Sequence, residues 1–238
     1  MLSLTSFLVK TGARRGTPVP RMPGLTSALQ SYVRQGPAAA SFEALVASAK
    51  SPQRIPFRAA YASVERRLKK VGEQAPPVPA ELRELARSHF GLTDWVRAAL
   101  LATALEASPE RRVESVLALF EGGELGEQES LLRTLSFLPE PALYVPVAEL
   151  GMRTNAQRLF AAIAAENPYP ARHFGSLQFN QMVLKAVFVE VSVLRIEGLA
   201  ERRTPELVRM AEAYACERRA AGRPVPEDIA RILGGNAR

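Results

Sequence analysis

Apolar residues recur at helical spacing along most of the chain. Residues 41–49 and 57–71 each place their large apolar side chains three or four positions apart, which is the period of an α-helix with one buried face. Residues 93–107 are apolar on nearly every side, and this predicts a central helix that is buried all round. Further helices are predicted over residues 79–88, 109–121, 124–137, 143–152, 156–166, 204–221 and 226–233.

Several boundaries of the predicted helices are inferred from residues that cap or end a helix. The segments Ser108-Pro109-Glu110 and Thr204-Pro205-Glu206 each combine a capping hydroxyl, a proline for the first turn and an acid near the positive end of a helix. Gly122 and Gly222 are expected to stop the two helices that follow these starts.

Residues 186–194 fit two periods. Valine occupies every second position from Val187 to Val193, and this alternation is typical of a strand. Helical patterns lie on both sides, however, and no partner strand is evident elsewhere. We therefore predict a buried helix over residues 177–194.

Helices of this length, joined by short turns, predict an all-α protein. The favoured architecture is an irregular array of antiparallel helix pairs, a HEAT-like α-solenoid, with an orthogonal helical bundle as the alternative. Residues 1–24 contain the proline- and glycine-rich run TGARRGTPVPRMPG and are predicted to form an N-terminal arm. Residues 25–238 are predicted to be a single helical domain, with a possible subdomain break at 75–79, where three prolines occur.

The charge is unevenly distributed. The formal net charge is +7, made up of +10 in residues 1–72, −6 in residues 73–166 and +3 in residues 167–238. The basic first third could meet an anionic partner or the acidic middle of its own fold. No apolar run is long enough to cross a membrane, and the first residues are a poor secretory signal. The single cysteine, Cys216, excludes an intrachain disulfide and fits a reducing compartment, so we predict a cytoplasmic location.

The usual signatures of catalysis are missing. The chain has no Walker loop, dinucleotide fingerprint, His-Glu-x-x-His motif or nucleophile elbow. His89 and His173 are its only histidines, and Asp94 and Asp228 its only aspartates. Because a metal centre needs several such ligands, we predict no metal site and no cofactor.

The stretch NPYPARHFGSLQFNQMVLKA, residues 167–186, concentrates aromatic, amide and basic side chains. On a helix, Gln178, Gln181 and Lys185 share one face, which is either a solvated face or a polar stripe lining a groove. In apolar surroundings the pKa of Lys185 would be lowered, making it a nucleophile or an anion ligand. His173 is either a general acid or base or the cap of a turn. The candidate ligand-binding residues are Tyr169, His173, Asn180, Gln181, Lys185 and Arg218.

Three residues around a predicted helix start are candidate anion ligands. Arg153, Asn155 and Arg158 lie where free backbone amides favour negative charge, although a simple helix cap is the alternative. Arg218 lies at the end of the helix over residues 204–221, where it either complements the negative helix end or clamps a phosphate or carboxylate.

Nucleic-acid binding is a rival hypothesis. Arg66, Arg67, Lys69 and Lys70 could contact phosphates, but they equally fit the exposed face and end of their helix. Binding of unpaired bases needs aromatic platforms, and Trp95, the sole tryptophan, lies in the acidic middle of the chain. The sequence therefore offers no strong support for a nucleic-acid partner.

Several segments together resemble the EboA family. They are EQESLLR (127–133), RTN (153–155), LFAAIA (159–164), NPYPARHF, FNQMVLKA and ERRAAGR, and the similarity covers roughly residues 80–235. The resemblance implies a bacterial cytoplasmic protein encoded beside a UbiA-type membrane prenyltransferase and other enzymes, in clusters associated with making or exporting secondary metabolites. It implies no catalytic residue.

We therefore expect a non-enzymatic helical scaffold, or a ligand-binding component of a secondary-metabolite pathway, whose partner is a small molecule or a pathway enzyme. One alternative is a small-molecule enzyme in which Lys185, His173 and Arg218 share a pocket. The other is a helical-repeat protein that binds nucleic acid through a basic concave face.

Overall fold

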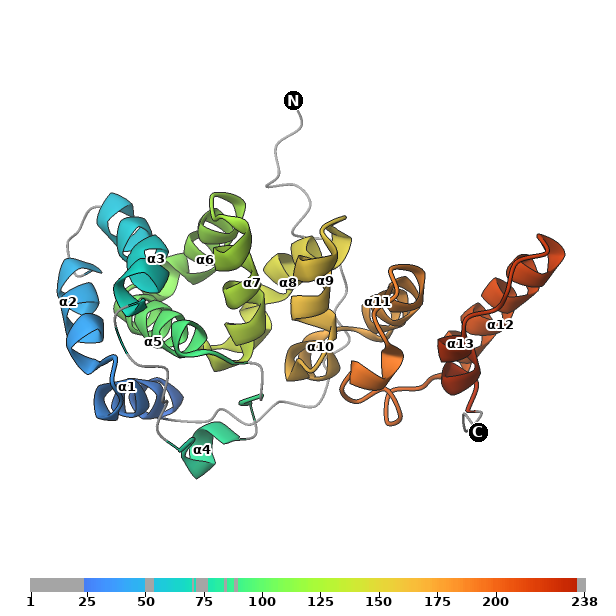
Figure 1. Cartoon of the computed structure of the whole chain (residues 1–238), viewed down its shortest axis with the longest axis horizontal. Coiled ribbons are helices and arrows are strands. Elements are labelled where there is room, and N and C mark those ends of the chain that lie inside the picture. Colours follow the sequence, from blue (N-terminus) through green and yellow to red (C-terminus); the bar gives the residue numbers. More distant parts are fainter. Residues whose placement is uncertain are drawn as a thin grey trace.

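A computed structural model of the chain describes residues 24–49, 54–69, 71, 77–83, 85–87 and 90–234. Figure 1 shows these residues as helices that succeed one another along the long axis of the molecule, from α1 at one end to α12 and α13 at the other. The helices are α1 (Leu25–Gln35), α2 (Ala39–Ala49), α3 (Arg54–Leu68), α4 (Ala80–Arg83), α5 (Leu92–Ala107), α6 (Arg112–Glu121), α7 (Leu125–Thr134), α8 (Val145–Arg153), α9 (Gln157–Ala164), α10 (Pro168–His173), α11 (Ser176–Phe188), α12 (Pro205–Ala220) and α13 (Glu227–Ile232).

The predicted all-α class is confirmed: the described residues contain helices, turns and no strand. The described residues also contain four short 3₁₀ segments, which are η2 (Pro109–Arg111), η3 (Leu135–Phe137), η4 (Pro141–Tyr144) and η5 (Val193–Arg195). The HEAT-like arrangement and the division into an arm and one domain remain predictions. The predicted arm, except Gly24, and residues 75 and 76 of the possible break at 75–79 lie outside the described residues.

Helix α5 is the centre of the N-terminal half. Ten of its sixteen residues are buried, and α1, α2, α3 and α7 all pack against it. The prediction of a helix buried on nearly all sides is therefore confirmed. Trp95, one turn into α5, is only 3% exposed and makes an edge-on contact with Tyr32 of α1, with ring centroids 4.9 Å apart. This contact ties the first helix to the central one.

The second half continues from α7 towards the C-terminus. Helix α9 packs against α7 and α8, α11 packs against α9, and α12 packs against α11 and α13. Large buried rings fill the spaces between these elements, among them Phe160, Tyr169 and Phe179. Figure 1 shows α12 and α13 as a pair at the far end of the molecule.

One of the two predicted caps is confirmed. The hydroxyl of Thr204 accepts a hydrogen bond of 3.1 Å from the backbone amide of Leu207 at the start of α12. The Ser108 side chain makes no capping hydrogen bond, and the segment after it forms η2 before α6 begins at Arg112. Helix α6 ends at Gly122 as predicted.

Two predicted helices are shorter than expected. In the 79–88 segment only Ala80–Arg83 is helical, and residues 84, 88 and 89 lie outside the described part. The helix predicted to reach residue 194 ends at Phe188. Glu190 then adopts a left-handed backbone with φ of 59°, and the Val191 amide donates back to the Ala186 carbonyl at 2.9 Å. This is the hydrogen bonding of a helix C-terminus, so the segment continues neither as a helix nor as a strand.

Two helices were not predicted. Helix α1 buries Leu29, Tyr32 and Val33 on one face, although its many serines and glutamines obscure the pattern. Helix α10 begins inside the NPYP segment, directly after the predicted helix over residues 156–166. Asn167 caps it by accepting a hydrogen bond from the Tyr169 amide at 2.9 Å, with Pro168 in the first turn.

Candidate functional site

Lys185 is held at the end of a neighbouring helix. Its Nζ donates to the carbonyls of Met152 at 2.7 Å and Thr154 at 2.8 Å, and it lies 5.2 Å from the centre of the Phe160 ring. These carbonyls belong to the C-terminus of α8, where orphan acceptors and the helix dipole favour a cation. Burial lowers the pKa of Lys185. Its contacts are those of a helix cap.

His173 lies against Tyr169 within α10, with ring centroids 4.6 Å apart. The Tyr169 hydroxyl donates to the Pro141 carbonyl at 2.7 Å. Burial, and secondarily the charge of Arg172, lowers the pKa of His173 to about 4. The imidazole is therefore neutral at pH 7.

This pKa predicts a loss of stability in acid. An unfolded histidine titrates near pH 6.5, so between about pH 6.5 and 4 the unfolded state binds the proton and the folded state does not. The contribution of the neutral imidazole to the free energy of unfolding is fully present above pH 6.5 and is lost as the pH falls towards 4. Because the ring is partly exposed, we expect His173 to account for only about 1–2 kcal/mol at pH 4.5. The measurement is urea unfolding at pH 7 and 4.5 for the wild type and for His173→Phe, which should lose less stability. Equal losses would contradict the assignment.

Asn180 and Gln181 are neighbours with different surroundings. Asn180 is 1% exposed, its Nδ2 donates to the Thr204 hydroxyl at 3.2 Å, and its Oδ1 has no partner among the described residues. Gln181 is exposed. The two candidate amides therefore do not share one surface. On the predicted polar stripe, the Gln178 amide donates to the Glu149 carboxylate, and Gln181 is exposed.

The arginines singled out from the sequence have nearby protein partners. Arg218 donates to the Pro224 carbonyl at 3.0 Å, just beyond the end of α12. Arg153 pairs with Glu149 of its own helix at 3.2 Å. Arg158 pairs with the buried carboxylate of Glu129 at 2.6 Å.

The other sequence candidates do not form a shared site. Asn155 is exposed, while the Thr154 hydroxyl accepts a hydrogen bond of 3.1 Å from the Ala156 amide before α9. Lys185, His173 and Arg218 each have a different set of partners, so their contacts do not join them. Of the basic stretch on α3, Arg66, Arg67 and Lys69 are exposed, and Lys70 lies outside the described residues.

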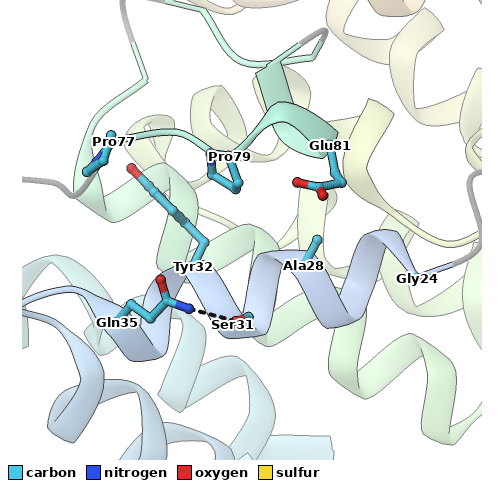
Figure 2. A pocket seen from close by; sticks show the side chains of 8 residues that line it. All are labelled: Gly24, Ala28, Ser31, Tyr32, Gln35, Pro77, Pro79 and Glu81. Atoms are coloured by element: carbon cyan, nitrogen blue, oxygen red, sulfur yellow. Dashed lines mark hydrogen bonds between the residues drawn. The ribbon is translucent and has the colours of Figure 1, made fainter.

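A cleft of about 360 Å³ opens between α1 and the segment that carries α4. Figure 2 shows the Tyr32 side chain pointing from α1 towards the segment with Pro77 and Pro79, and the Gln35 amide turned along α1 to Ser31. Glu81 points back from α4. The lining residues are Gly24, Ala28, Ser31, Tyr32, Gln35, Pro77, Pro79 and Glu81. Its volume lies within the range of small-molecule sites, of order 300–1,000 Å³.

The cleft combines apolar walls with hydrogen-bonding groups. Tyr32 belongs to an aromatic cluster with Trp95, which in turn contacts Phe90 and Phe137 edge-on, with ring centroids 5.6 and 5.3 Å away. This cluster holds the Tyr32 wall in place. At the rim, the Gln35 amide donates to the Ser31 hydroxyl at 3.1 Å, and the Glu81 carboxylate is exposed. These groups suit a flat, partly apolar molecule with hydrogen-bond donors.

Sequence reasoning missed this cleft. Its two sides are separated by more than forty positions, and nothing in the local pattern of either shows that they meet. The sequence does contain one signal for the cleft. Tyr32 has two small residues, Ala28 and Ser31, beside it at helical spacing, and a proline-rich connector follows later in the chain.

No helix in the described part of the chain has both the length and the apolar composition of a membrane span. The described residues also bring together no group of three His, Cys, Asp or Glu side chains that could hold a metal ion.

Comparison with known proteins identifies a family. No curated protein and no solved structure is significantly similar to the chain. The family model described as metabolite traffic protein EboA matches residues 45–234, so the similarity begins well before residue 80, where the resemblance was expected to start. Because the match spans most of the sequence, the chain belongs to the EboA family.

Proposed function

We propose that this protein binds a small metabolite in the cleft between α1 and the Pro77–Arg83 segment and holds it without chemical change. The observation that carries the proposal is the cleft itself, with its rigid Tyr32 wall, two prolines and polar rim. The family description supports a metabolite-related role. We further propose that the protein is a helical component of a secondary-metabolite pathway and that it supplies its ligand to a pathway enzyme such as a prenyltransferase.

The contacts of the basic and titratable candidates favour binding over catalysis. The Lys185 ammonium donates to two backbone carbonyls, so a nucleophilic role would require it to leave a helix cap. His173 and Arg218 have no contact with it. A binding function needs none of these residues to move, whereas an enzyme built on them needs all three to rearrange.

A substitution that fills the cleft tests the proposal. Ser31 is exposed and lines the cleft, so Ser31→Phe should occupy ligand space without disturbing the core. We expect the amount of co-purified ligand to fall about tenfold or more, because overpacking a binding site costs about 1–3 kcal/mol. The measurement is untargeted mass spectrometry of small molecules released from the purified protein.

The matched control is Ser27→Phe, which changes the same residue type on the same helix. Ser27 is exposed but does not line the cleft, so this variant should retain the wild-type amount of ligand. Equal retention by both variants, or no retained molecule in the wild type, would contradict metabolite binding at this site.

A further inference from the structure

Glu81 is the only charged residue among the described residues that line the cleft. The other polar side chains there, Ser31, Tyr32 and Gln35, are neutral, and no lysine or arginine is among them. Figure 2 shows the Glu81 side chain pointing from α4 back towards α1, where Ala28 lies. The described wall of the cleft is therefore negative at this end.

The backbone that carries Glu81 is held by a buried neighbour. Leu82 is 0% exposed, its amide donates to the Pro79 carbonyl at 3.1 Å, and α4 packs against α1. The Glu81 carboxylate itself is exposed, and no described side chain forms an ion pair or a hydrogen bond with it. A carboxylate on an anchored segment thus remains open to a ligand.

The described arginines closest in sequence to the lining residues are engaged elsewhere. Arg34 of α1 donates to Glu43 at 2.6 Å, and Arg83 donates to the Val78 carbonyl at 3.4 Å. Neither arginine lines the cleft. A phosphate or carboxylate bound there would therefore lie near Glu81 and would meet no cation among the described lining residues, so like charges would repel.

We propose that the metabolite held in this cleft is an organic amine, bound as its ammonium by Glu81, with its apolar part between Ala28 and Pro79. This inference rests on the proposed binding function and specifies the class of ligand. An ammonium has three donors and no acceptor, and its hydrogen bond to a carboxylate is charge-assisted. Because Glu81 is exposed, water and salt screen the pair, so we expect only about a fivefold preference for an ammonium over a neutral group.

The same charge pattern disfavours amino acids and phosphorylated metabolites. An α-amino acid also carries an ammonium, but its carboxylate would have no cation among the described lining residues. A phosphate ester would bring a larger negative charge towards Glu81. The ligand is therefore expected to carry a net positive charge at pH 7.

Three compounds with one phenyl ring test the charge preference. Phenethylamine, 2-phenylethanol and phenylacetate carry an ammonium, a hydroxyl and a carboxylate at the end of a similar apolar body. In ligand-observed NMR titrations of the full-length protein at pH 7, phenethylamine should bind about fivefold more tightly than the alcohol, and phenylacetate more weakly than either. Added sodium chloride should narrow the difference. Equal Kd values for amine and alcohol, or no binding of phenethylamine at millimolar concentration, would overturn the amine assignment.

A neutral variant of the same size locates the preference. Glu81→Gln changes only an exposed side chain, so the fold should be unaffected, and the variant should bind phenethylamine about as weakly as 2-phenylethanol. The matched control is Glu65→Gln, which removes the same charge from an exposed residue of α3 that does not line the cleft. That control should keep the full preference, whereas a preference that survives in Glu81→Gln would overturn the role of Glu81.

The amine assignment and the proposed function fail in different ways. Ser31→Phe fills the cleft and should weaken binding of all three compounds, while Glu81→Gln should weaken only that of the amine. If the molecule retained by the purified protein is an acid or a phosphate ester and Ser31→Phe releases it, the amine assignment is wrong but metabolite binding stands. If Ser31→Phe changes neither the retained molecule nor the Kd for phenethylamine, the cleft is not the site and both proposals fail.

Discussion

Asn167→Asp should destabilise the protein by about 3–4 kcal/mol, even though aspartate is as good a helix cap as asparagine. Asn167 is 3% exposed. Its Nδ2 donates to the carbonyls of Leu132 at 3.0 Å and Ala162 at 2.8 Å, while its Oδ1 accepts from the Tyr169 amide at 2.9 Å. One side chain thus joins the end of α7, the end of α9 and the start of α10.

The aspartate keeps the acceptor that caps α10 but presents a second oxygen to two carbonyls. Both carbonyls lose their donor, and each buried polar group left without a partner costs about 1–3 kcal/mol. The free energy of unfolding should be measured by urea denaturation at pH 7, with an unchanged m-value as evidence that the folded and unfolded states stay comparable. Asn167→Ala, which also removes the cap, should lose at least as much.

The control is Asn155→Asp, the same change at an exposed asparagine just before α9. A surface change of this kind should stay within about 0.5 kcal/mol of the wild type. If Asn167→Asp also stayed within that range, the two hydrogen bonds that it donates would not hold the three helices together. The NPYP segment would then need another explanation.

Local chemistry made much of the fold predictable. The cap at Thr204, the stop at Gly122 and the burial of α5 all follow from a few neighbouring side chains, and all three are confirmed. The end of α11 was not predictable in the same way. Phe188 is 72% exposed, and the chain turns away at Glu190 through a positive φ, which no apolar period within residues 186–194 signals.

The cleft and the surroundings of Arg97 both depend on partners distant in sequence. Arg97 interrupts an otherwise apolar helix. Only the packing of α5 against α3 and α7 shows that this side chain is buried, with its Nη1 donating to the Gly126 carbonyl. Conversely, Lys185 is conspicuous in its segment, but the carbonyls that engage it lie more than thirty positions earlier. Sequence patterns identified unusual residues more readily than their partners.

The loop between η5 and α12 explains a second large effect. Arg202→Met should destabilise the protein by about 3 kcal/mol, because the guanidinium is the clamp of α10. Its Nη1 donates to the carbonyls of Pro170 at 2.8 Å and Ala171 at 3.0 Å, and its Nη2 donates to that of Phe174 at 2.7 Å. A hydrogen bond from a charged donor contributes about 1.5–3 kcal/mol to stability. The total loss is smaller than the sum of three such bonds, because water can hydrogen-bond to the carbonyls in the variant.

The packing of the loop depends on this clamp. The guanidinium also lies 4.4 Å from the centre of the Phe179 ring, and Gly198, with φ of 70°, lets the loop pass so close to Ala171 that an added Cβ would lie 2.9 Å from its side chain. Methionine keeps the apolar stem against Phe179 but loses every donor. Lysine keeps the charge, yet its single ammonium cannot reproduce the fork of two nitrogens.

Arg202→Lys should therefore recover only a minor part of the loss, and hydrogen exchange should accelerate in α10 for both variants. Arg209→Met is the matched control, because Arg209 is exposed and pairs only with Glu206 one turn away at 2.6 Å, a contact worth about 0–1 kcal/mol. Full recovery by lysine would mean that charge alone matters at this position. The C-terminal carbonyls of α10 would then be satisfied by any cation, and the three-carbonyl geometry would carry no stability of its own.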